Sequence, residues 1–280
     1  MPATLISIWW SAAKVWVNVG KSQFHLPTGK AQVLRGHTAL VIPGRDALLA
    51  RLASVAPKLE GTAFSFAARN DHVEATCPWG NRLRIHEPDG ARFGPVTLGM
   101  PHVEFETGIG TARGICAFYK EIMGIPADLA DGDEAVARVK VGNAQYLQFR
   151  ESDRQPPAFD GHHIQIYIAD FSGPYRKLLE RGLITREDNP YQYRFCDIVD
   201  PADGRHLFTV ERHRQNGKHR ARNFDGHSLH LRRRETIYRG NCFQPAGVQR
   251  HRHACARSHR AVPAERYAGM SGARGPDGSR

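Results

Sequence analysis

The sequence contains an internal repeat, and this repeat restricts the possible fold more than any other feature. Three segments of the first half align, in the same order, with three segments of the second half. The matched pairs are Gly20 with Gly142, His37 with His163 and Gly80 with Gly204, so the offsets lie between 122 and 126 residues. Matches in one order at nearly one offset indicate a duplicated half.

Within the second half, the spacing of apolar residues predicts strands, helices and hairpins. Met100–Thr107 alternates like a strand, and Thr111–Ile125 places its apolar residues on one helical face. A hairpin that turns at Gly142 follows, and then a strand over His162–Asp170 and a short helix. Tyr193–Glu211 reads as a closing hairpin, with Pro, Asp and Gly in its turn. The order of strand, helix and hairpin therefore occurs twice.

This pattern resembles the vicinal oxygen chelate superfamily, the group of the glyoxalases, bleomycin resistance proteins and extradiol dioxygenases. His102 and His163, each followed by an alternating strand and a helix, carry the resemblance together with the closing hairpin Asp200–Phe208. The likeness extends from about Lys14 to Glu211. It implies an α+β fold in which tandem βαβββ modules form open, curved mixed sheets around a metal-binding cleft.

The resemblance also predicts the domain organisation. Residues 1–92 would be an N-terminal half without its first strand and helix, because the counterpart of His102 falls before Met1. Residues 97–211 would be a C-terminal domain, and residues 212–280 a disordered tail. The tail has 16 Lys+Arg against 4 Asp+Glu and few large apolar residues. A basic arm, a His-rich metal-binding tract such as HRHACARSHR and a stretch translated out of frame all account for its composition.

Strand periodicity supplies the candidate site. Residues two apart share a face of a strand, so His102 and Glu104 point one way, as do His163 and Tyr167. The resemblance implies that His102 and His163 bind a divalent metal, with Glu211 as the third ligand. Such a set suits Fe(II), or zinc, manganese or nickel, and leaves positions open for two vicinal oxygens. As catalytic candidates, the same faces offer Glu104, as a base, and Tyr167.

Departures from the family pattern keep two functions open. Phe208 stands where the family usually has the third ligand, Gln148 where it has the fourth, and Arg84 where it commonly has a metal-binding glutamate. The first function is a metal-dependent lyase, isomerase or ring-cleaving dioxygenase that acts on a small substrate with vicinal oxygens. The second is a metal-free protein that binds a small, antibiotic-like molecule in the same cleft. His25 and His37 are a weaker candidate metal pair, for which a core or solvent-facing role is favoured.

The remaining features concern partners and location. The five cysteines are widely spaced and form no C-x-x-C pair, which favours a reducing cytoplasm. No stretch approaches the ~18 uncharged residues of a membrane span. A missing first strand would expose the edge of Lys14–Val19 and favour homodimerisation. The basic tail would bind nucleic acid only nonspecifically. The expected partner is therefore a small-molecule substrate.

Overall fold

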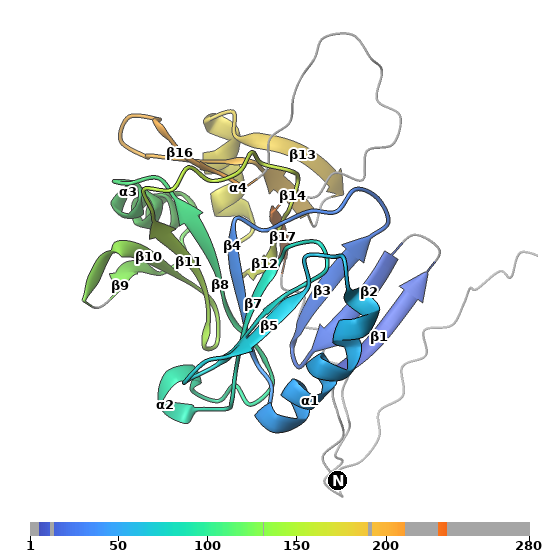
Figure 1. Ribbon diagram of the computed structural model, residues 1–280. Helices are drawn as coiled ribbons and strands as arrows, with labels where there is room; N and C mark the ends of the chain where they lie inside the picture. The colour runs from blue at the N-terminus through green and yellow to red at the C-terminus, as the bar shows by residue number, and fades with distance from the viewer. Residues whose placement is uncertain (1–5, 12–13, 131, 190–191, 211–228, 234–280) are drawn as a thin grey trace, which may run out of the picture. The chain divides into compact units, whose positions relative to one another are not determined.

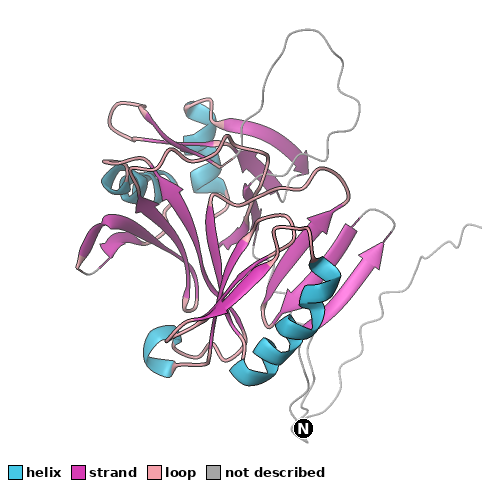
Figure 2. Cartoon of the chain, viewed as in Figure 1, coloured by secondary structure: helices cyan, strands magenta, loops and turns pink. Residues whose placement is uncertain are grey.

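The computed structural model describes residues 6–11, 14–130, 132–189, 192–210 and 229–233. All of them belong to one of the chain's two compact units, Met1–Thr236. Strands make up most of the described secondary structure, and the helices are short (Figure 2). No helix in these ranges is long and apolar enough to cross a membrane.

The first βαβββ module lies in the N-terminal part of the chain (Figure 1). Its elements are β4 (Gly36–Val41), α1 (Arg45–Val55), the 3-10 turn η1 (Ala56–Leu59), β5 (Ser65–Ala68), β6 (Val73–Thr76) and β7 (Arg82–His86). β4 runs parallel to β7, which pairs antiparallel with β6, and β6 with β5. The half assigned to residues 1–92 therefore contains one complete module, with its own leading strand and helix.

A second module of the same order follows after the short helix α2 (Gly90–Phe93). Its elements are β8 (Gly99–Thr107), α3 (Ala112–Ala117), the π-helix η2 (Phe118–Ile122), β9 (Ala127–Ala130), β10 (Asp133–Gly142) and β11 (Gln145–Glu151). β8 runs parallel to β11, and β10 lies between β11 and β9. This module confirms the elements that were predicted from the spacing of apolar residues between Met100 and Glu151.

The leading strands of the two modules join them into one sheet. β4 pairs antiparallel with β8, so the sheet has eight strands in the order β5-β6-β7-β4-β8-β11-β10-β9. Gly36 makes the closest approach at this junction, because a Cβ atom on it would lie 1.8 Å from the Glu104 carbonyl oxygen. The junction therefore requires glycine at this position.

Two apolar clusters cover one face of this sheet. β4 and β7 contribute Leu40 and Ile85 to a cluster against the leucines of α1. β8 and β11 contribute Phe105 and Phe149, whose ring centroids lie 5.2 Å apart, to a larger cluster with α3 and η2. Burial of these side chains leaves the opposite face of the sheet to polar residues.

The N-terminus forms a separate three-stranded sheet of β1 (Ile6–Ser11), β2 (Lys14–Val19) and β3 (Ser22–Pro27). β2 is its central strand, with β1 on one side and β3 on the other. The prediction that Lys14–Val19 presents an exposed edge is therefore wrong. The apolar segment before it, which was not assigned to a strand, supplies the missing backbone partner.

The last sheet again has the order strand, helix and three further strands, but its final strand is not the one that the sequence predicted. It contains β12 (Gln165–Ile168), the helix α4 (Ser172–Glu180), β13 (Ile184–Asn189), β14 (Gln192–Phe195) and β17 (Leu229–Arg233), and its strand order is β12-β17-β14-β13. β17 runs parallel to β12 and antiparallel to β14. The expected closing hairpin instead forms a two-stranded sheet of β15 (Asp197–Val199) and β16 (His206–Thr209). The final strand thus comes from the segment that was assigned to the tail.

Candidate functional site

The polar face of the eight-stranded sheet gathers five side chains from its four central strands. They are His37 on β4, Arg84 on β7, His102 and Glu104 on β8 and Gln148 on β11. Ala39 lies opposite both Arg84 and His102 in the strand register. Glu104 lies opposite both His37 and Gln148. Because directly paired residues project from the same face of a sheet, these five residues share one side, called here the polar face.

His37 and Glu104 form the buried part of the polar face. His37 is 4% exposed and Glu104 is 6% exposed. The Nδ1 atom of His37 lies 3.5 Å from Oε1 of Glu104, and Oε2 of Glu104 accepts a hydrogen bond of 3.3 Å from Nε of Arg150. The Nε2 atom of His37 has no hydrogen-bond partner among the described residues. A buried polar atom of this kind calls for a bound water or ligand.

Both histidines of the polar face are neutral at physiological pH. Desolvation, reinforced by the charge of Arg84, lowers the pKa of His37 to about 3. Desolvation also lowers the pKa of His102 to about 4, with smaller contributions from His86 and Arg84. The two rings contact each other edge to face, with centroids 5.7 Å apart. The polar face therefore offers uncharged imidazoles that donate and accept hydrogen bonds.

Arginines surround these histidines and leave a surplus of positive charge. Arg82 pairs with Glu106, and Arg150 pairs with Glu104 and Asp133. Two others make no ion pair among the residues that the structure describes. Arg84 lies opposite Glu74, whose pKa its charge helps to lower, and Arg138 lies over the ring of Tyr146, 3.8 Å from its centroid. Unpaired guanidinium groups beside neutral histidines form an environment for an anion.

The donor set of the polar face does not fit a divalent metal ion. Within the described ranges, His37, His102 and Glu104 do not bring three ligand atoms within 4.8 Å of one another. Arg84 lies on the same face, and its fixed positive charge acts on both histidines. This charge disfavours a cation at this point.

The predicted histidine ligands lie in different sheets and have different ring neighbours. His102 on β8 contacts His37, whereas His163, which precedes β12 in another sheet, lies next to His25 with ring centroids 6.2 Å apart. Tyr167 is 56% exposed on β12, and Glu211 lies outside the described residues. Glu104 does share the face of His102, as strand periodicity predicted. The metal-binding role of His102, His163 and Glu211 remains a prediction.

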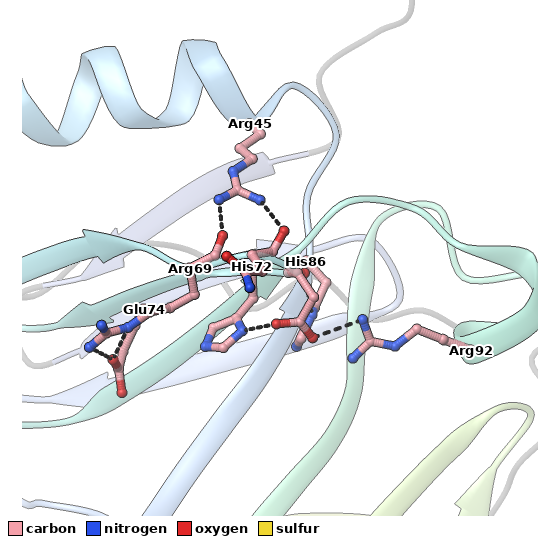
Figure 3. A network of polar contacts seen from close by, with 8 residues as sticks. Arg45, Arg69, His72, Glu74, His86 and Arg92 are labelled. Carbon is pink, nitrogen blue, oxygen red and sulfur yellow. Dashed lines mark hydrogen bonds and ion pairs between the residues drawn. The ribbon is translucent and has the colours of Figure 1, made fainter.

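A second polar cluster, which sequence reasoning missed, lies where β6 begins and β7 ends. Asp71, His72 and His86 bring one ligand atom each within 4.8 Å of one another. Figure 3 shows His72 and His86 among arginines. Arg92 forms an ion pair with the Asp71 carboxylate at 3.0 Å. The hydrogen bond from His72, followed by the contact with Arg92, lowers the pKa of Asp71 to about 2. Its signal in the sequence was a pair of histidines on either side of a short hairpin.

The arrangement of the sheet determines the fold type. Each module consists of a leading strand, a helix and three further strands, of which the last runs parallel to the first. Two such modules share one mixed sheet through their leading strands, and the candidate residues lie on its polar face. The fold is the vicinal oxygen chelate fold. This confirms the α+β architecture of tandem βαβββ modules that the sequence predicted.

Comparisons with known proteins give limited similarity. No protein-family model and no curated protein matches the chain. Among solved structures, a proposed dioxygenase of Bacillus subtilis is 18% identical, over 65% of this chain and 68% of its own, with a TM-score of 0.42. A catechol 2,3-dioxygenase is 11% identical, over 72% and 96%, with a TM-score of 0.30. A lactoylglutathione lyase of Agrobacterium tumefaciens is 14% identical, over 47% and 90%, with a TM-score of 0.26.

Proposed function

We propose that this protein binds a small anionic molecule on the polar face, without a metal ion between His37 and His102. The observation that carries the proposal is the position of Arg84, whose guanidinium has no ion pair among the described residues and acts on both neutral histidines. An unpaired arginine favours a carboxylate or phosphate group, which it binds through two parallel N–H donors. Like the second function that the sequence left open, it needs no metal ion, but its ligand is a small anion and not an antibiotic-like molecule.

His37 narrows the chemistry of the ligand. Its Nδ1 atom faces the Glu104 carboxylate at 3.5 Å, which favours the tautomer with the proton on Nδ1. The unpartnered Nε2 atom is then a hydrogen-bond acceptor. A ligand that satisfies both Arg84 and His37 therefore carries an anionic oxygen and a hydroxyl group. Monohydrogen phosphate and 2-hydroxycarboxylates are small molecules with both groups.

Calorimetric titration with inorganic phosphate in excess EDTA tests the proposal. We expect saturable binding by the wild-type chain and at least tenfold weaker binding by Arg84→Gln, because the bidentate contact is lost. The matched control is Arg51→Gln, which removes an exposed arginine of α1 and keeps the basic tail. Equal binding by Arg84→Gln and the wild type would refute the proposal, as would binding that disappears in EDTA.

A metal-dependent reaction on a substrate with vicinal oxygens is the second candidate. Its support is the lowered pKa of His102, which keeps this imidazole in the unprotonated form that binds metals. Under this hypothesis His102 and His163 hold the ion, with Glu211 as third ligand and Glu104 as base. The metal content of purified wild-type, His102→Ala and His163→Ala proteins tests it. An unchanged content in both variants would exclude this ligand set.

A further inference from the structure

The β6–β7 hairpin positions two histidines across from each other. Val73 on β6 lies opposite Ile85 on β7, so the next pair outward consists of His72 and His86. Their ring centroids are 5.3 Å apart. Val73 and Ile85 are buried in the apolar cluster, which directs their neighbours along the strands to the other face. The register of the hairpin thus fixes the spacing of the two imidazoles.

Asp71 completes the group from the turn that precedes β6. Its Oδ1 atom lies 2.7 Å from Nδ1 of His72, and its carbonyl oxygen lies 3.2 Å from Nδ1 of His86. His86 is 5% exposed, whereas Asp71 is at the surface. One carboxylate and two imidazoles, with one side open to solvent, form the donor set of a tetrahedral zinc site with a free position.

Surrounding contacts hold this turn in place before any ion binds. Arg45 donates hydrogen bonds to the carbonyl oxygens of Arg69 and Asn70, and the Arg69 guanidinium pairs with Glu74 at 2.7 Å (Figure 3). Arg92 binds the Oδ2 atom of Asp71, which leaves Oδ1 directed at His72. A turn that is already ordered loses little conformational entropy when it binds a ligand.

We propose that Asp71, His72 and His86 form a binding site for a divalent transition-metal ion of the zinc class. The ion would take the place of the proton between Asp71 and His72 and would link the β6–β7 hairpin to the turn before it. The site lies on the same side of the sheet as Arg84, at the end of β7. None of its three ligands is among the five residues of the polar face, so it does not depend on the proposed function. Its three ligands lie within 16 residues of sequence, in one module.

Titration of the full chain with Co²⁺, followed by its d–d absorption, tests this site. We expect tetrahedral absorption in the wild type and a loss of at least tenfold in affinity in His72→Ala and in His86→Ala. The matched control is His206→Ala, because His206 also faces one carboxylate, that of Asp197 at 3.4 Å, but has an exposed position in β16. This control should keep the wild-type affinity.

Three outcomes would overturn the proposal: equal Co²⁺ affinity in the wild type and His72→Ala, an equal loss in His206→Ala, or octahedral absorption in the wild type. His72→Asn is a second variant that preserves a polar side chain at the β6 start. It should retain the wild-type melting temperature without metal and still lose the tetrahedral band. The phosphate titration of Arg84→Gln reports on the polar face alone, so failures of the two proposals can be distinguished.

Discussion

The stability of this protein should fall steeply as the pH drops below 6.5, because its polar face buries two neutral histidines. The pKa of His37 is about 3 and that of His102 about 4 in the folded chain, against 6.5 for a histidine in the unfolded chain. At a pH between the folded and the unfolded pKa, the histidine is protonated in the unfolded chain but not in the folded chain. Unfolding therefore becomes more favourable as the pH falls through this range. At pH 5, 1.5 units below the unfolded pKa, each histidine costs about 2 kcal/mol.

Urea denaturation at pH 7.5 and pH 5.0 measures this loss, and His37→Asn isolates the share of one histidine. Asparagine keeps a polar group near the Nδ1 position but does not titrate in this range. The free energy of unfolding of the variant should fall by about 2 kcal/mol less than that of the wild type over the same pH interval. All other titrating groups are common to both proteins. Equal losses in the two proteins would refute the assignment of a buried, neutral His37.

Three further predictions concern the fold. Phe149→Ala should lower the free energy of unfolding by about 3 to 5 kcal/mol in urea denaturation, because its ring is fully buried in the larger cluster; a loss under 1 kcal/mol would contradict the packing. Gly36→Ala should prevent cooperative folding by circular dichroism, since its Cβ would overlap a β8 carbonyl, whereas Gly90→Ala, with open space around it, should fold normally. Deletion of 237–280 should leave the melting temperature unchanged, whereas deletion of 212–280 should lower it by several degrees, because β17 pairs with β12 and β14; equal melting temperatures would show that β17 is dispensable.

The sequence predicted the fold type well because the signals for it are local. Alternation over Met100–Thr107 and a helical face over Thr111–Ile125 specify their elements without reference to the rest of the chain. The strand partners were harder, because pairing depends on contacts between distant segments. β8 pairs with β4, a partner that no local pattern indicated, and the cleft shared with the strand at His163 remains a prediction. Periodicity fixes which residues share a face and leaves the neighbouring strand undetermined.

The candidate site, too, could be predicted only as far as local patterns determine it. Glu104 was predicted on the face of His102, and the departure at Arg84 was visible in the sequence. His37 received little weight, because the N-terminal half was expected to lack its first strand and helix, although the strand that carries His37, β4, was itself predicted. The burial of His37 and its lowered pKa arise from the β4–β8 pairing, which no local pattern encodes.

The central claim is that the polar face binds an anion through Arg84. A crystal soaked in sodium selenate with EDTA, measured at the selenium edge, tests it most directly. We predict an anomalous peak about 3 to 4 Å from the Arg84 guanidinium, where the selenate oxygens accept its N–H hydrogen bonds. A polar face without a selenium peak, together with a metal ion bound by His102 in crystals grown without EDTA, would contradict the account.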